Sequence, residues 1–147
     1  MFLINTLLAF KCLAKDGNFI IKLYDTFTHF TIGLIYIIFK NFERVSIFKP
    51  VSTRQYSSSR FLIAEKYLKE TSETTNNSIK YLEDFLKNHT NLRNNNSDVK
   101  YFLPPSELRN NENFLKIIPE INNGITEKRI DPLKDITKKQ NYMIKYQ

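Results

Sequence analysis

Apolar side chains are concentrated in the first half of the chain, and this gradient limits what the chain can fold into. Phe, Ile and Leu crowd residues 1–70, whereas Asn, Lys, Glu and Ser dominate from about residue 70 onward. Because folding removes apolar surface from water, residues 1–70 are expected to form the core and the later residues its periphery. The chain as a whole is 41% hydrophobic, which excludes disorder throughout.

The apolar half predicts an alternating order of helices and strands. Apolar residues recur at helical spacing in two places; Asp16-Gly17 ends the first helix, and Thr28 is a favoured N-cap residue for the second. Between them, the sequence NFIIKLYD carries apolar residues at odd and even positions, which suits a strand covered on both faces. The expected elements are a helix over 3–15, a strand over 18–25, a helix over 29–41, and strands over 42–50 and 60–67.

This order indicates an α/β fold. It is typical of the later half of a mostly parallel sheet with helices on its faces, ending in an antiparallel edge strand. Gly33 would let the second helix approach a neighbouring element closely. Gly17, Gly33 and Gly124 are the only glycines and make no nucleotide-binding fingerprint, so we expect no recognisable cofactor pocket in this chain.

Residues 71–147 predict a linker and a mainly helical extension. The composition turns to Ser, Thr, Glu and Asn over 71–78, where Ser78 would cap a helix over 79–92. A short VKYFL segment then ends at Pro104-Pro105, and weaker helical signals follow over 106–121 and 127–144. The chain is therefore expected to divide into residues 1–70 and residues 71–147.

The net charge and the cysteine count limit the kinds of partner and metal site that the chain can have. A net charge of +7 favours a polyanion such as nucleic acid or an anionic surface, because neutralising phosphates releases counterions; a merely solvated basic surface is the alternative. A single cysteine, Cys12, excludes an intrachain disulfide, and with His29 and His89 it makes no zinc-site spacing. No metal is therefore expected.

Two apolar stretches resemble targeting or membrane segments only superficially. MFLINTLLAFKCLAK has no basic n-region and carries Lys11 inside its apolar stretch. The run from Phe30 to Phe39 is about half the ~20 residues that a membrane-spanning helix needs. We expect both stretches to be buried helices and expect no membrane partner.

Lys22 is the residue that the hydrophobic pattern does not explain, because it places a charge in the middle of a strand expected to be buried. From the pattern alone, a strand-edge lysine that reaches solvent is favoured over a functional amine. The sequence that follows Lys22 reverses this preference.

The pieces KLYDTFTHFTIGLIY, FERVSIFKPVSTR and SSSRF, with NLRNNNSDV further on, resemble the C-terminal part of the FtsJ-like (RrmJ-like) ribose methyltransferase domain. Within that superfamily the chain looks most like the eukaryotic cap-specific mRNA 2'-O-methyltransferases, which make cap 1. The resemblance runs from about residue 3 to 68, returns around 80–105 and is faint beyond 107. It implies that residues 1–70 are the C-terminal half of a Rossmann-like S-adenosylmethionine-dependent sheet, and that the cofactor-binding half is absent from this chain.

The resemblance also implies roles for three residues, and the position of a fourth, Arg54, in the loop between two strands indicates its role. A Lys-Asp-Lys-Glu tetrad surrounds the ribose in this family, and its second lysine falls on Lys22, which would accept the proton of the 2'-hydroxyl or orient its oxygen. The first lysine and the aspartate would lie upstream of Met1. The glutamate position falls on Ser59, a departure that removes a negative charge, and a position that contacts the capped substrate falls on Ser57. Arg54, in the same loop, would contact the RNA.

Such a cluster makes physical sense, because a lysine with its free pKa of ~10.4 is nearly always protonated at neutral pH. Burial and neighbouring cations lower the pKa of a lysine, whereas carboxylates raise it and aim the amine. The implied cofactor is S-adenosylmethionine, the implied partner is capped mRNA, and the implied location is the nucleus. The chain alone is expected to be inactive.

Several nearby residues keep two interpretations. Arg54 and Arg60 would contact RNA phosphate or make ordinary surface pairs, and Tyr56 would stack on a base or simply be an exposed loop tyrosine. Asp25 and Glu43 are expected to be structural. The aromatic residues at helical spacing are expected to be core: Phe30, Tyr36, Phe39 and Phe42.

Two further hypotheses compete with an enzyme. The chain could be a non-catalytic module whose basic surface binds RNA or a partner. It could instead be a truncated gene product that is unstable alone, because half a sheet exposes an unpaired strand edge.

Overall fold

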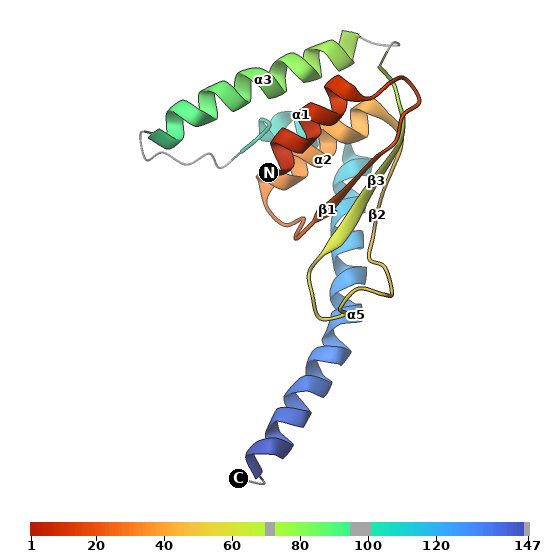
Figure 1. Cartoon of the computed structure of the whole chain (residues 1–147), viewed down its shortest axis with the longest axis vertical. Helices are drawn as coiled ribbons and strands as arrows, with labels where there is room; N and C mark the ends of the chain where they lie inside the picture. The colour runs from red at the N-terminus through yellow and green to blue at the C-terminus, as the bar shows by residue number, and fades with distance from the viewer. Residues whose placement is uncertain (70–72, 95–100, 146–147) are drawn as a thin grey trace.

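The computed structural model describes residues 1–69, 73–94 and 101–145, with the side chains of 73, 90–94 and 135–145 left aside. Figure 1 shows a small sheet with helices α1 and α2 beside it, α3 crossing α1, and a long α5. The elements are α1 (Phe2–Cys12), β1 (Phe19–Leu23), α2 (His29–Asn41), β2 (Phe42–Phe48), β3 (Arg60–Tyr67), α3 (Glu73–Asn94), α4 (Pro105–Arg109) and α5 (Glu112–Lys145).

The three strands are ordered β1-β3-β2, and β3 pairs antiparallel with both neighbours. An antiparallel last strand was expected, but its predicted place at the edge of the sheet is wrong. The loop after β2 brings β3 back along β2, and the other side of β3 then pairs with β1, opposing Leu23 to Arg60. The central position suits β3, since Leu62 and Ala64 are fully buried.

Strand β1 is covered on one face only within the described part of the chain. Leu23 is buried, whereas Ile20 is 63% exposed and Lys22 is also exposed. The prediction of a strand buried on both faces is therefore wrong. The reason is the alternation of strand side chains, which turns even-numbered positions of β1 toward the face that the helices do not cover.

Aromatic rings connect the helices to the sheet. Of the four aromatic residues expected to be core, Tyr36 and Phe42 are buried and Phe30 is half-buried, whereas Phe39 is 38% exposed, so the prediction is wrong for Phe39. Phe10 of α1 lies 5.3 Å from the Tyr67 ring and 6.0 Å from the Phe42 ring, between centroids. Phe30 packs on Phe102 at 5.4 Å. The close approach expected at Gly33 is confirmed, because a Cβ there would lie 3.1 Å from the Cβ of Phe102.

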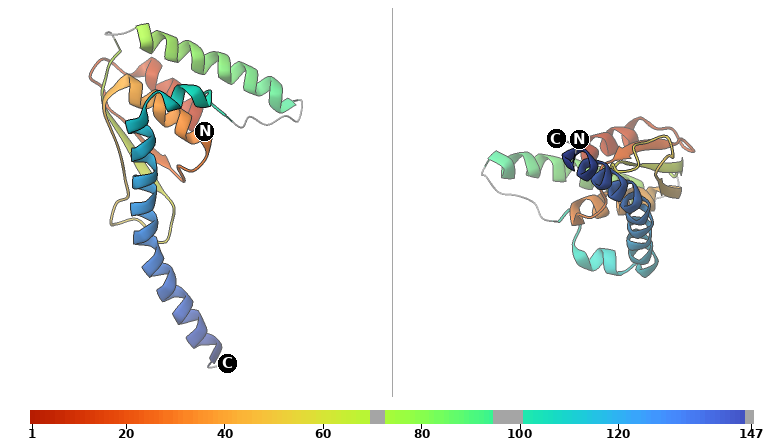
Figure 2. Two further views of the ribbon diagram at one scale, coloured as in Figure 1. Left: turned by 180° about the vertical axis from the view of Figure 1, so that it is seen from behind. Right: turned by 90° about the horizontal axis from the view of Figure 1, so that it is seen from below.

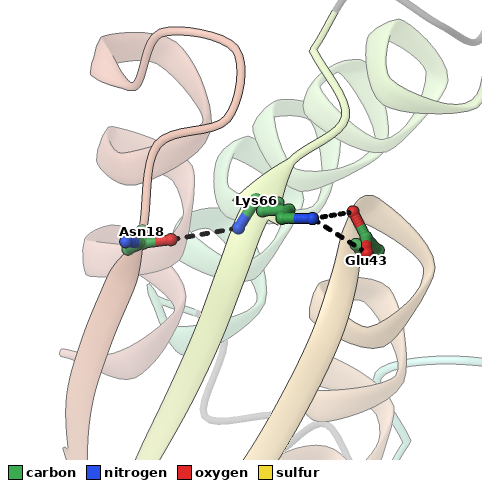
Figure 3. Close-up of polar contacts among 3 residues, drawn as sticks. All are labelled: Asn18, Glu43 and Lys66. Carbon is green, nitrogen blue, oxygen red and sulfur yellow. Dashed lines mark hydrogen bonds and ion pairs between the residues drawn. The ribbon is translucent and has the colours of Figure 1, made fainter.

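One end of the sheet is tied together by Lys66. Its backbone nitrogen donates to Asn18 Oδ1 at 3.0 Å, and its Nζ pairs with Glu43 of β2 at 3.0 Å. Figure 3 shows the Lys66 side chain reaching across to Glu43 while Asn18 faces its backbone. Glu43 is thus structural, as predicted.

The extension differs from its prediction in two ways. Helix α3 begins at Glu73, so Ser78 lies within the helix, where its hydroxyl donates to the Thr74 carbonyl at 2.8 Å rather than capping a helix end. Helix α5 is one continuous helix through Pro119 and Pro132, where two helices were expected. Residues 70–72 of the expected linker, and 95–100 of NLRNNNSDV and VKYFL, lie outside the described residues.

The extension contributes to the core that residues 1–70 form. Leu82, Phe102 and Leu108 belong to the same buried cluster as Leu34 and Leu62. In both views, the first half of α5 lies along the sheet, and its second half continues past the β2–β3 loop (Figures 1 and 2). None of the described helices is both long and apolar enough to cross a membrane.

Candidate active site

Lys22 lies on β1, opposite Phe61 of β3. Its Nζ is 5.5 Å from the centroid of the Tyr24 ring, and within residues 1–69, 73–94 and 101–145 it makes no hydrogen bond or ion pair. The expected burial of this amine is therefore wrong. Lys22 nevertheless lines a hollow of about 340 Å³, whose other walls come from α1, β1 and the start of α2: Met1, Phe2, Asn5, Ile21, Leu23, Tyr24, Asp25 and Thr31.

Asp25 shares this hollow with Lys22, although the sequence gave no reason to pair the two. The Asp25 Oδ1 accepts the Phe27 backbone N–H at 3.4 Å, which bends the chain after β1. This hydrogen bond supports the structural role expected for Asp25. The hollow also places one carboxylate and one amine within a single opening.

The β2–β3 loop over residues 49–59 carries Arg54, Ser57 and Ser59. Because Leu23 pairs with Arg60, Ser59 lies one residue beyond the paired part of β3, at the end of the sheet where β1 also ends. Ser57 Oγ lies 3.0 Å from Ser59 Oγ and accepts the Ser59 backbone N–H at 3.2 Å. Ser59 is 5% exposed, whereas Arg54 is exposed. The structure thus brings Ser57 and Ser59 together but shows no contact between them and Lys22.

Lys49 holds this loop in shape. Its Nζ donates to the backbone carbonyls of Arg54 at 3.1 Å and Ser59 at 3.4 Å, and also to the carbonyl of Ser57. Burial lowers the pKa of Lys49, and the nearby Arg129 and Arg60 charges lower that pKa further. Sequence reasoning missed this residue; the only local signal was a lysine directly before the proline that ends a strand.

Arg60 is fully buried, so both interpretations of it as a surface arginine are wrong. Its Nη1 donates to Thr26 Oγ1 at 2.7 Å and to Asn122 Oδ1 at 2.6 Å, and its Nε donates to the Ser58 carbonyl at 3.2 Å. Burial lowers the pKa of Arg60; the Arg129 charge lowers it further, whereas Asp25 raises it. The guanidinium therefore serves as an internal connector.

Two residues of helix α5, Asn122 and Arg129, form hydrogen bonds with this region. Asn122 accepts from Arg60 and donates its Nδ2 to the Thr26 carbonyl at 3.2 Å. Arg129 donates its Nε to the Tyr56 carbonyl at 3.2 Å. The Tyr56 side chain is 43% exposed, which agrees with an exposed loop tyrosine and leaves its ring accessible. No local sequence signal could have linked α5 to this loop.

A second cavity, of about 780 Å³, separates the end of β2 from α5. Its walls are mostly apolar and include Phe48, Val51 and Ile125, with Gln55 and Lys128 also among the lining residues. The four ionisable lining residues balance in charge: Lys49, Lys128, Glu120 and Asp131. This cavity therefore does not select an anion by its own charges.

The described residues do not fit a methyl-donor site. Gly17 stands between a helix and a strand, Gly33 packs on Phe102, and Gly124 lies inside α5, so none opens a strand-to-helix turn. The part of the chain that the structure covers also holds no group of three or more His, Cys, Asp or Glu placed for a metal ion. What these residues can do chemically is present an amine beside a loop of hydroxyl groups and cations.

Comparison with known proteins gives one family model and several similar proteins. The model of the FtsJ-like methyltransferase family matches residues 1–67. The chain is 35% identical over 139 residues to cap-specific mRNA (nucleoside-2'-O-)-methyltransferase 1 of Drosophila melanogaster, covering 92% of this chain and 17% of that protein. Proteins with the same name from Dictyostelium discoideum and Xenopus laevis are 35% and 32% identical, over 88% and 92% of this chain and 16% of each relative.

Three conclusions follow from these matches. The likeness extends further than expected, because an alignment that covers 92% of this chain must pass residue 107. The chain spans only 16% or 17% of the length of these relatives. Over residues 1–67, the chain belongs to the FtsJ-like methyltransferase family.

Proposed function

We propose that this chain carries the ribose-facing part of a methyltransferase that modifies the first transcribed nucleotide of capped mRNA at its 2'-oxygen. The observation that supports the proposal most strongly is Lys22, an amine that lines a hollow of about 340 Å³ at the end of the sheet where the 49–59 loop begins. An amine that makes no hydrogen bond or ion pair with the described residues is available to hold a substrate hydroxyl. Lys22 accepts the proton of the 2'-hydroxyl or orients its oxygen by a hydrogen bond.

The loop over residues 49–59 is proposed to bind the capped substrate. Ser57 and Arg54 contact the RNA, and the uncharged Ser59 takes the position of the tetrad glutamate. Lys49, Arg60 and Arg129 lie around this loop, and each donates its hydrogen bonds to uncharged acceptors. Among the residues that the structure describes, none of these three cations forms an ion pair with a carboxylate, so their charges are proposed to favour a phosphate-rich partner.

S-adenosylmethionine is the proposed methyl donor, and its site is expected outside the described residues. The 147 residues alone are therefore expected to show no turnover, since donor and acceptor must be held together for the displacement. The proposed location is the nucleus, where the substrate is made. The division at residue 70/71, between the methyltransferase segment and the extension, remains a prediction.

A non-catalytic RNA-binding module is the second candidate. It is favoured by one observation, which is that Ser59 supplies no negative charge to aim an amine. Salt-dependent binding of capped and uncapped RNA without any methyl transfer, in a protein that contains the donor site, would support it.

The decisive experiment is a chimera. The matching segment of the Drosophila relative is replaced by this chain, and transfer of labelled methyl to capped RNA is measured. We expect the chimera to be active and Lys22→Met to lower its rate by about 10²–10⁴-fold. Lys80→Met, an exposed lysine on α3, is the matched control. Equal activity of the Lys22→Met and Lys80→Met chimeras would contradict the proposed role of Lys22.

A further inference from the structure

We propose that α5 positions the candidate substrate loop, with Asn122 and Arg129 as its positioning residues. This inference rests on the proposed function, because it concerns the loop proposed to bind capped RNA. Neither residue lines the hollow at Lys22. Each acts through the backbone or side chains of the segments that surround that hollow and the loop.

Asn122 and Arg129 lie on one face of α5. They are seven residues apart, which is about two helical turns. Ile118 and Ile125, at 5% and 7% exposure, lie on the same face, so this part of the helix is fixed against the body of the protein. A helix anchored in this way is a rigid support for a neighbouring loop.

Asn122 connects α5 to both strands that end at the site. Its Oδ1 accepts from Arg60 Nη1 at 2.6 Å, at the first residue of β3. Its Nδ2 donates to the Thr26 carbonyl at 3.2 Å, next to Asp25, which lines the hollow. Thr26 and Arg60 are themselves joined at 2.7 Å. A shift of Asn122 would therefore move the start of β3 and the segment after β1 together.

Arg129 connects α5 to the middle of the loop. Its Nε donates to the Tyr56 carbonyl at 3.2 Å, one residue before Ser57. Lys49 binds the carbonyls on either side, those of Arg54 and Ser57. Arg60 Nε also donates to the Ser58 carbonyl at 3.2 Å, so three cations hold the loop backbone at successive points. Among these hydrogen bonds to the loop backbone, the Arg129 bond comes from outside the loop and its flanking strands.

The test uses the whole 147-residue chain with Arg129→Gln, and with Lys128→Gln as the control. Lys128 is the exposed neighbour on the same helix, so its change removes the same charge without touching the Tyr56 carbonyl. Hydrogen exchange reports on the amides of residues 50–59, and binding is measured to a cap-0 RNA oligonucleotide. We expect Arg129→Gln to increase loop exchange and to weaken binding about tenfold more than Lys128→Gln does. Arg129→Lys, which keeps a donor and the charge, should restore part of the affinity.

Each outcome separates this inference from the function on which it rests. Failure of the unchanged chain to bind capped RNA would contradict the proposed function. Binding by the unchanged chain, with Arg129→Gln and Lys128→Gln equally affected, would overturn the positioning role alone. Faster loop exchange without weaker binding would also overturn it, since Arg129 would then support the fold and not the substrate. Thermal unfolding of each variant confirms that the compared proteins are folded.

Discussion

Arg60 and Asn122 are 62 residues apart in the chain and are joined by a buried hydrogen bond of 2.6 Å between Nη1 and Oδ1. Arg60 opens β3, and Asn122 lies in the first half of α5, so this bond joins the segment that matches the family model, residues 1–67, to a helix beyond it. The guanidinium has no buried carboxylate as a hydrogen-bond partner and depends on neutral oxygens. Buried polar groups of this kind stabilise a fold only while their partners remain in place.

Asn122→Ala should therefore destabilise the protein. It removes the Asn122 bonds to Arg60 and to the Thr26 carbonyl and leaves a buried guanidinium with fewer acceptors. We expect the free energy of unfolding to fall by about 2–3 kcal/mol. Urea denaturation measures it, with the exposed neighbour Asn123→Ala as the control. Equal urea midpoints for the two variants would show that the bond contributes nothing.

The two helical glycines should respond in opposite directions to alanine. In Gly33→Ala the new Cβ would lie 3.1 Å from the Cβ of Phe102, which is 1% exposed and enclosed by other rings, so it cannot retreat. We expect a loss of about 1–2 kcal/mol in unfolding free energy. In Gly124→Ala the Cβ meets nothing within 4 Å, and the higher helix propensity of alanine should add about 1 kcal/mol.

Thermal denaturation of the two glycine variants, measured side by side, tests whether the packing clash or the helix propensity of alanine dominates at each position. A rise in melting temperature for both would mean that α2 can move away from Phe102. A fall for both would mean that the space beside Gly124 is occupied in solution.

The local elements were predictable because their signals are local. Thr28 caps α2 by accepting the Thr31 N–H at 3.1 Å, as an N-cap threonine should. The predicted end of the first helix at Asp16-Gly17 is wrong, because α1 already ends at Cys12. The strand order was not predictable, because the residues of β3 carry no signal that the strand pairs with a neighbour on each side. Arg60 was misjudged for a related reason: its partners Thr26 and Asn122 are distant in sequence and uncharged, so no charge pattern announced its burial.

The candidate site was only partly predictable. The resemblance named Lys22, Ser57 and Ser59, and the loop position named Arg54. The structure puts all four near one end of the sheet without testing their roles. Lys49 and Arg129, which support the loop, were missed because they bind backbone carbonyls. An arginine or lysine bound to a carbonyl has the same sequence signature as one in water.

Tyr67 should make the protein sensitive to alkaline pH. Burial raises the pKa of Tyr67 to about 12, from an ordinary value near 10. The folded state therefore holds this proton more tightly than the unfolded state, so its contribution is fully present below pH ~10 and is lost as the pH rises toward 12. The Tyr67→Phe variant removes this titration, together with the 2.9 Å bond to the Phe10 carbonyl.

Urea denaturation at several pH values tests the Tyr67 prediction. The unfolding free energy of the unchanged protein, measured relative to Tyr67→Phe, should be constant below pH ~10 and decrease between pH ~10 and ~12. A constant difference across that range would show that Tyr67 ionises alike in the folded and unfolded states.

Lys49→Met should loosen the β2–β3 loop more than an equal change at an exposed lysine. The variant keeps the apolar stem but removes the ammonium that donates to the carbonyls of Arg54, Ser57 and Ser59. Hydrogen bonds to charged groups contribute about 1.5–3 kcal/mol each, and because Lys49 is only half-buried we expect a total loss of about 1–2 kcal/mol. Lys66→Met, which breaks the exposed pair with Glu43 shown in Figure 3, should lose less than about 1 kcal/mol.

The residues at which hydrogen exchange becomes faster distinguish the loss of the Lys49 hydrogen bonds from a general loss of charge. Hydrogen exchange should accelerate over residues 50–59 in Lys49→Met, while exchange in the strands β1 and β2 stays as in the unchanged protein. In Lys66→Met the 50–59 loop should be unaffected, because Lys66 lies near the opposite end of β3 from Arg60. If the loop exchanged equally fast in both variants, the carbonyls would be satisfied by water as well as by Lys49. Arg129 and Arg60, bound to the carbonyls of Tyr56 and Ser58, would then be left to fix the loop that carries Ser57.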